Sequence, residues 1–191
     1  MSLDDRTFLL TTTQYWPTIE SLHQANRSGH WVLEACENFQ KKSLRNRTIL
    51  PFPQGNQYLS IPLEGGKNQN CPIKDIRISY SEDWRKQHIS SIKMHCFRHP
   101  YYDHVFECIA PVLDKKPSFL WDLNLELLSR VIWIFGMKEL ALYETTTYEK
   151  SYEDNILDLR NSGLSQVPSD LFSDSTIAQL CKMGPTLFLD N

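Results

Sequence analysis

The sequence of 191 residues lacks a long apolar run, which membrane proteins need. No stretch approaches the ~18 consecutive apolar residues of a transmembrane helix. The longest apolar segment, VIWIFGM at 131–137, suits the end of a buried helix. Arg6 is the only cation among the first residues, and no long apolar run follows it, unlike in a signal peptide. These absences predict a cytoplasmic protein that does not insert into a membrane.

Cysteine pairs and the common catalytic signatures are also missing. The five cysteines show no CxxC spacing, which favours free thiols in a reducing cytoplasm over a disulfide framework. Walker A, GxGxxG, GxSxG and HExxH motifs are absent, so the commonest nucleotide-binding and hydrolase signatures are excluded. No cofactor is predicted.

The chain has no excess of positive charge. Its 20 basic and 23 acidic residues give a formal net charge of −3, which argues against a non-specific nucleic-acid binder. A local basic patch is still compatible with a small anionic ligand. Length and a composition with 41% hydrophobic residues predict one globular domain over residues 1–191.

The first half of the chain contains short segments typical of strands. Apolar and β-branched residues predict strands at 7–13 and 31–35. Between them, a helix is predicted from Pro17 to Gly29. Turn residues separate three further predicted strands, at 47–52, 58–63 and 73–80.

The second half is predicted to be mainly helical. Ser81 is expected to cap a helix with Glu82 and Asp83 in its first turn, and Pro100 to end that helix and begin the next. The fold class is therefore α/β or α+β, with short strands early and helices late. The remaining predicted elements are helices at 101–113, 118–135 and 175–183 and a strand at 140–145.

The segment FQKKSLRNR, at 39–47, is the most basic part of the sequence. It is hereafter the basic segment. One interpretation is a solvated turn whose charges are balanced by Glu34 and Glu37. In the other, Arg45 and Arg47 lie on one face of a strand and clamp a phosphate or carboxylate, with Asn46 facing the other way. Lys41 would add a point charge.

A second cluster lies on the predicted helix that follows the strands. Trp84 and His88 are four residues apart and share a helix face, which Ile92 and Cys96 continue. They are either packed core residues or the wall of a pocket with His88 as a general base.

Metal binding and cysteine catalysis are not predicted. Cys36 is flanked by Glu34 and Glu37, so it lacks the electropositive setting that a nucleophilic cysteine needs. Histidines and cysteines near Pro100 lie on both sides of a helix break, and their spacing matches no zinc motif. These residues are His95, Cys96, His99, His104 and Cys108.

An ordered set of motifs resembles the WbqC-like family of bacterial proteins over nearly the whole chain. Leu44 departs from it, since an aromatic residue is expected there, and 162–172 lacks the aromatic cluster of the family. The motifs are QYWP (14–17), the basic segment, LSIPL (59–63), IKDIRIS (73–79), DWRKQHISSIK (83–93), HPYYDHVFE (99–107), SFLWDLNLELL (118–128), DLRN (158–161) and STIAQLCKMGP (175–185).

The family is associated with cell-surface polysaccharide biosynthesis of the O-antigen type. The resemblance leads to the hypothesis of group transfer on an activated sugar, with a nucleotide sugar as the anionic ligand. The alternative is a non-catalytic ligand-binding or scaffold protein. His88 is the candidate catalytic base; Lys41, Ser43, Arg45, Asn46, Arg47 and Trp84 are candidates for ligand binding, with Glu34, Asp122, Asn124 and Arg160 as secondary candidates.

Overall fold

A computed structural model describes residues 8–52, 55–65, 71–152 and 155–161. Contacts divide the chain into two compact units. Unit 1 takes residues up to 12, 17–35 and 131 onward, and unit 2 takes residues 13–16 and 36–130. None of the helices in the part that the structure describes is long and apolar enough to span a membrane.

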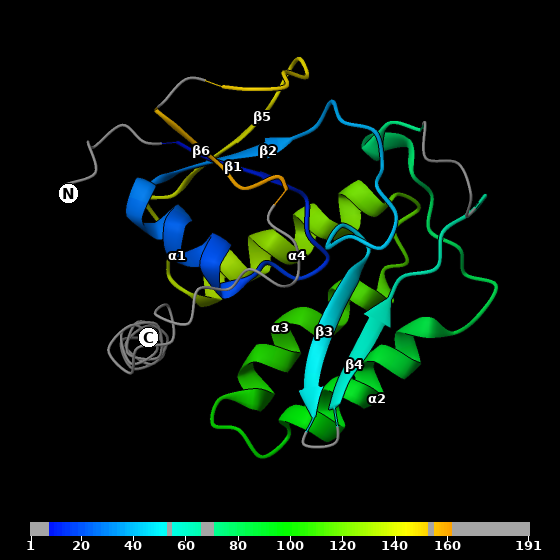
Figure 1. The fold of residues 1–191 in the computed structure, drawn as a ribbon. Coiled ribbons are helices and arrows are strands. Elements are labelled where there is room, and N and C mark those ends of the chain that lie inside the picture. Colours follow the sequence, from blue (N-terminus) through cyan, green and yellow to red (C-terminus); the bar gives the residue numbers. More distant parts are fainter. Residues whose placement is uncertain (1–7, 53–54, 66–70, 153–154, 162–191) are drawn as a thin grey trace. The chain divides into compact units, whose positions relative to one another are not determined.

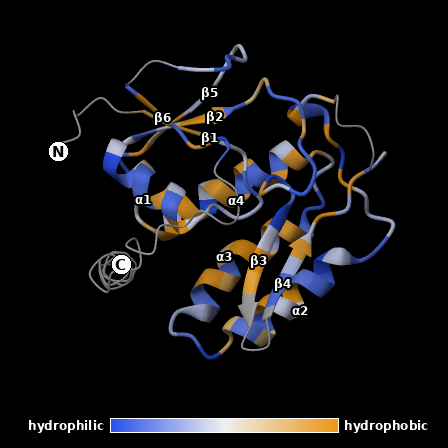
Figure 2. Cartoon of the chain, viewed as in Figure 1, coloured by the Kyte–Doolittle hydropathy of each residue, from blue (hydrophilic) through white to orange (hydrophobic). Residues whose placement is uncertain are grey.

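Unit 1 is built on a parallel sheet of four strands in the order β5-β2-β1-β6 (Figure 1). Apolar residues line β1 and β2 (Figure 2), and Leu9, Leu10 and Leu33 among them are almost fully buried. The strands are β1 (Phe8–Thr12), β2 (His30–Glu34), β5 (Ala141–Glu144) and β6 (Ile156–Asp158).

Helix α1 (Ile19–Ser28) connects β1 to β2 in unit 1. It begins where the Ser21 N–H donates to the Thr18 hydroxyl at 3.1 Å, which satisfies an otherwise unpaired N-terminal amide. Gly29 ends the helix at φ 69°, a left-handed conformation that favours glycine. The predicted stop at Gly29 is therefore confirmed.

Unit 2 contains a β-hairpin and the helices of the second half. In the hairpin, Arg47 pairs with Ser60 and Thr48 with Leu59. Because side chains alternate along a strand, Thr48 and Leu50 lie on one face and Arg47 on the other. The elements are β3 (Arg47–Phe52), β4 (Gly55–Ser60), the 3-10 helix η1 (Ile73–Asp75), α2 (Trp84–Cys96), α3 (Tyr102–Asp114) and α4 (Leu120–Ile134), whose end belongs to unit 1.

The mixed α/β class, with short strands early and helices mostly late, is confirmed. The strand predicted at 58–63 ends at Ser60, before Pro62, which has no N–H to continue the ladder. The segment 73–80 forms η1 and isolated bridges instead of a strand. Strand β6 was not predicted, and the helix predicted at 175–183 lies outside the described residues.

The starts of α2 and α3 also differ from the prediction. Ser81 does not cap α2, because the helix begins at Trp84 and Asp83 occupies the cap position. Ser81 instead contacts the Ser79 hydroxyl. Pro100 does not begin α3, since Tyr101 has a left-handed φ of 66° and the helix starts after it.

Candidate functional site

The basic segment forms a turn that leads into β3. Lys42 has a φ of 56°, and the Ser43 hydroxyl donates to the Gln40 carbonyl at 2.6 Å. Lys42 is exposed and Lys41 is half-buried. Ser43 therefore stabilises the turn that carries the two lysines.

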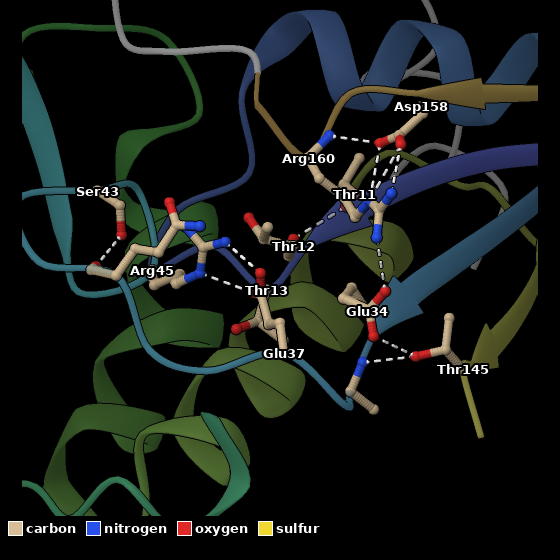
Figure 3. A network of polar contacts seen from close by, with 12 residues as sticks. Thr11, Thr12, Thr13, Glu34, Glu37, Ser43, Arg45, Thr145, Asp158 and Arg160 are labelled. Carbon is tan, nitrogen blue, oxygen red and sulfur yellow. Dashed lines mark hydrogen bonds and ion pairs between the residues drawn. The ribbon is translucent and has the colours of Figure 1, made fainter. Parts of the chain in front are cut away.

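Arg45 turns inward and forms a buried ion pair with Glu37 (Figure 3). Its Nε donates to Glu37 Oε1 at 2.7 Å, and its Nη2 contacts Glu37 Oε2. Arg45 is 2% exposed and Glu37 5%. The expected acidic partner is confirmed for Glu37. The predicted clamp of Arg45 and Arg47 on one strand is wrong, because Arg45 precedes β3 and its charge is already neutralised.

Asn124, on α4, fixes the backbone beside this ion pair. Its Nδ2 donates to the Arg45 carbonyl at 2.8 Å and contacts the Thr13 hydroxyl at 3.3 Å. Asn124 is 1% exposed. Its amide thus joins three distant parts of unit 2 and holds the path of the basic segment.

Arg47 and Asn46 are anchored to β4 and the residues after it. Asn46 Nδ2 donates to the Ile61 carbonyl at 3.0 Å. Arg47 Nε donates to the Ser60 hydroxyl at 2.9 Å, and its guanidinium lies 5.5 Å from the centre of the Tyr58 ring. Within the described ranges, neither Arg47 nor Lys41 has an ion-pair partner. Their positive charges are therefore not neutralised there by acids of the protein.

Trp84 and His88 pack together, as the shared helix face predicts. Their rings meet edge to face with centroids 5.0 Å apart. The Trp84 indole donates to the Ser79 carbonyl at 3.1 Å. Trp84 is 2% exposed and His88 4%, so both belong to the interior.

Both sides of the His88 imidazole have hydrogen-bond partners. Its Nδ1 lies 2.8 Å from the Tyr15 hydroxyl, and the Ser60 backbone provides a second hydrogen bond. Burial lowers the pKa of His88 to about 4, although the bond to Ser60 acts in the opposite direction. Burial also raises the pKa of Tyr15. At neutral pH the tyrosine therefore keeps its proton and donates it to the neutral imidazole.

An apolar cavity of about 390 Å³ lies in unit 2, among β3, α2 and α3. Ile92 and Cys96 continue the helix face of His88 into this cavity. Trp16, which follows Tyr15 in the sequence, also forms part of the wall. The lining residues are Trp16, Thr48, Leu50, Ile92, Cys96, His99, Pro100, Tyr101, Tyr102, Val105, Phe106, Ile109, Ala110 and Leu113.

In unit 1, a second buried polar network joins the carboxyl ends of parallel strands (Figure 3). Arg160 Nη1 donates to Glu34 Oε2 at 3.0 Å, and its Nη2 donates to Asp158 Oδ2 at 2.6 Å. The Thr145 hydroxyl donates to Glu34 Oε1 at 2.6 Å. This edge of a parallel sheet is where α/β proteins commonly bind ligands.

The guanidinium of Arg160 is, however, already engaged. Its Nη1 also donates to the Glu149 carbonyl at 2.9 Å. Burial alone would raise the pKa of Asp158, but the hydrogen bonds and charge of Arg160 outweigh it and lower the pKa. The network therefore connects strand ends and leaves Arg160 little capacity to bind an external anion.

Other sequence candidates lie apart from these clusters. Asp122 is exposed in the first turn of α4, where a carboxylate interacts favourably with the helix dipole. Cys36 is exposed and is not in a disulfide. In the described part of the chain, no group of three or more His, Cys, Asp or Glu side chains is arranged to hold a metal ion.

Sequence reasoning missed Tyr15, Asp158 and the cavity. Tyr15 stands inside QYWP, a motif with a visible signal, but its partner lies 73 positions away. Asp158 stands two residues before Arg160 in DLRN, so local spacing could have paired them. The only signal for the cavity was the continuation of the His88 face through Ile92 and Cys96.

Removing Arg45 alone should strongly destabilise the fold. Arg45→Met leaves the Glu37 carboxylate buried without its cation, which typically costs about 3–5 kcal/mol. Adding Glu37→Leu removes the uncompensated charge and should restore most of the stability. The measurement is a double-mutant cycle by urea unfolding. Additive losses in the double variant would contradict a coupled ion pair.

The buried imidazole should make stability depend on pH. Because the folded-state pKa of His88 lies below its ordinary 6.5, the unfolded state binds more protons and stability falls as pH drops below about 6.5. At pH 5 the loss from this residue is about 2 kcal/mol. His88→Gln should lower stability at pH 7. The variant should also lose the part of the stability decline at low pH that protonation of His88 causes. The measurement is urea unfolding of both proteins at several pH values. Equal pH dependence in the two proteins would refute the assignment of this pH effect to His88.

Comparison with known families gives one result that covers most of the chain. A family model described as the WbqC-like protein family matches residues 13–166, or 154 of the 191 residues. Neither the curated proteins nor the solved structures give a match. The match includes the basic segment, α2 and DLRN, and it confirms the resemblance that the motifs indicate.

Proposed function

The chain belongs to the WbqC-like protein family, and from this premise we propose that it performs group transfer on an activated sugar in the cytoplasm, during cell-surface polysaccharide biosynthesis. The family's association with O-antigen synthesis supports the pathway. The observation that carries the proposal is the basic segment, in which Arg45 is neutralised internally while Lys41 and Arg47 are not.

The diphosphate of a nucleotide sugar suits these cations. Arginine offers a planar fork of donors that matches phosphate oxygens, and lysine adds a compact charge. The Ser60 hydroxyl engages only Nε of Arg47, so the described hydrogen bonds fix the guanidinium and leave its terminal nitrogens for a ligand. The Tyr58 ring supports the same group.

Arg47→Ala should weaken binding of a nucleotide diphosphate sugar. Losing one charged hydrogen bond typically costs about 1.5–3 kcal/mol, which corresponds to roughly 10- to 150-fold in affinity. Isothermal titration with UDP-glucose and with pyrophosphate provides the measurement. Arg98→Ala is the matched control, because Arg98 is exposed and lies outside the basic segment. Equal affinities for the wild type and Arg47→Ala would remove the anion site.

In the transfer reaction, an attacking sugar hydroxyl or amine must lose a proton. We assign its acceptance to His88, whose imidazole is neutral at pH 7, with Trp84 forming the adjacent wall. Since Tyr15 donates to Nδ1, its hydroxyl must either move aside or pass the proton on.

One observation favours non-catalytic binding as the second candidate function. His88 and Tyr15 are buried, and the imidazole already has two hydrogen-bond partners. A binding or scaffold protein needs such a pair only to hold its fold. In that case the basic segment would recognise a ligand without turnover.

His88→Gln separates these two functions. For a transferase, turnover per folded protein should fall at least about a hundredfold, while affinity for the nucleotide sugar stays within a fewfold. Product formation would be followed by mass spectrometry, with nucleotide sugars and an acyl thioester donor as substrates. Undiminished turnover in His88→Gln would exclude His88 as the base. Binding without turnover in the wild type would favour the binding protein.

A further inference from the structure

We propose that the apolar cavity among β3, α2 and α3 binds the unbranched aliphatic chain of an acyl-bearing ligand. This is a second binding function, and it does not rest on the sugar-transfer proposal. The cavity volume of about 390 Å³ lies within the range of small-molecule sites in proteins, roughly 300–1,000 Å³. Aliphatic and aromatic side chains supply most of its wall.

The wall changes from buried to exposed along the cavity. Ile109 and Leu113, on α3, are 4% and 1% exposed and form an apolar floor. The consecutive residues His99, Pro100 and Tyr101 are exposed and form the mouth. A ligand with an apolar chain and a polar end matches this gradient, because the chain leaves water while the polar end stays near the mouth.

Two wall residues, Trp16 and Tyr102, carry buried polar atoms, and the Tyr102 hydroxyl is the one suited to bind an acyl oxygen. The Tyr102 hydroxyl has no hydrogen-bond partner among the residues that the structure describes. Leaving such a group unsatisfied is costly, so a partner from the ligand is favourable. The carbonyl or carboxylate oxygen at the end of an acyl chain can accept from this hydroxyl.

The lack of lysine and arginine side chains in the described wall makes the cavity unsuitable for the diphosphate ligand that we propose for the basic segment. Among the residues that the structure describes, no lysine or arginine lines the cavity, so a diphosphate would have no strong partner there. Thr48 and Leu50 face the cavity, whereas Arg47 lies on the opposite face of the hairpin beside Ser60. An acyl chain in the cavity and an anion at Arg47 therefore occupy separate places.

A series of fatty acids from hexanoate to dodecanoate tests this inference on the full-length protein. Each added methylene that becomes buried should tighten binding about fourfold, until the cavity is full. Isothermal titration at concentrations below micelle formation measures the step. The corresponding methyl esters should show the same step, because the chain is the buried part. A series with no dependence on chain length would overturn the inference.

Two substitutions on α3 give a matched comparison. Ala110→Leu adds three carbon atoms inside the cavity and should shorten the longest chain accommodated, with at least a tenfold loss for dodecanoate. Glu107→Leu introduces the same side chain one turn earlier at an exposed position outside the cavity, and should leave binding unchanged. Circular dichroism confirms folding of both variants. Equal losses in the two would contradict the location.

Tyr102→Phe tests the polar end. Removing one neutral hydrogen bond should weaken binding of the methyl ester of dodecanoic acid roughly 2- to 13-fold, while the step per methylene remains. Unchanged affinity would overturn the role of the hydroxyl. Because titration of UDP-glucose against Arg47→Ala uses another ligand and another residue, failure of the cavity and failure of the sugar site are distinguishable.

Discussion

The buried ion pair between Arg45 and Glu37 is the constraint on which unit 2 depends. Two charges inside a protein are tolerated only when each satisfies the other, so the chain must bring these residues together. Asn124 then holds the Arg45 carbonyl, and Arg47 begins β3 two residues later. The pair thereby decides which cation of the basic segment turns inward.

A neutral hydrogen bond has a corresponding role elsewhere in unit 2. His88 stays uncharged because its burial lowers its pKa, and it therefore accepts the proton of Tyr15. The same face of α2 continues to the apolar cavity. One helix face thus combines a polar contact that fixes the chain with part of the wall of an apolar cavity.

In unit 1, buried charges are also neutralised by partners within the protein, in a larger network. Parallel strands place Glu34 and Asp158 at one edge of the sheet, where two carboxylates would repel each other. Arg160 lies between them, and its cation stabilises both. Arg160 matches the family motif DLRN, and its contacts show a role in holding the strand ends of the sheet together.

The sequence by itself determined the mixed class, most elements, the family motifs, and the shared face of Trp84 and His88. These features depend on residues a few positions apart, where helix and strand periodicity are informative. Only the tertiary structure decided that Arg45 is buried, that Tyr15 meets His88, and that Glu34 meets Arg160 across 126 positions. The cavity also required it, because its walls come from separate elements. Such pairings depend on the path of the chain between the partners, which local patterns do not specify.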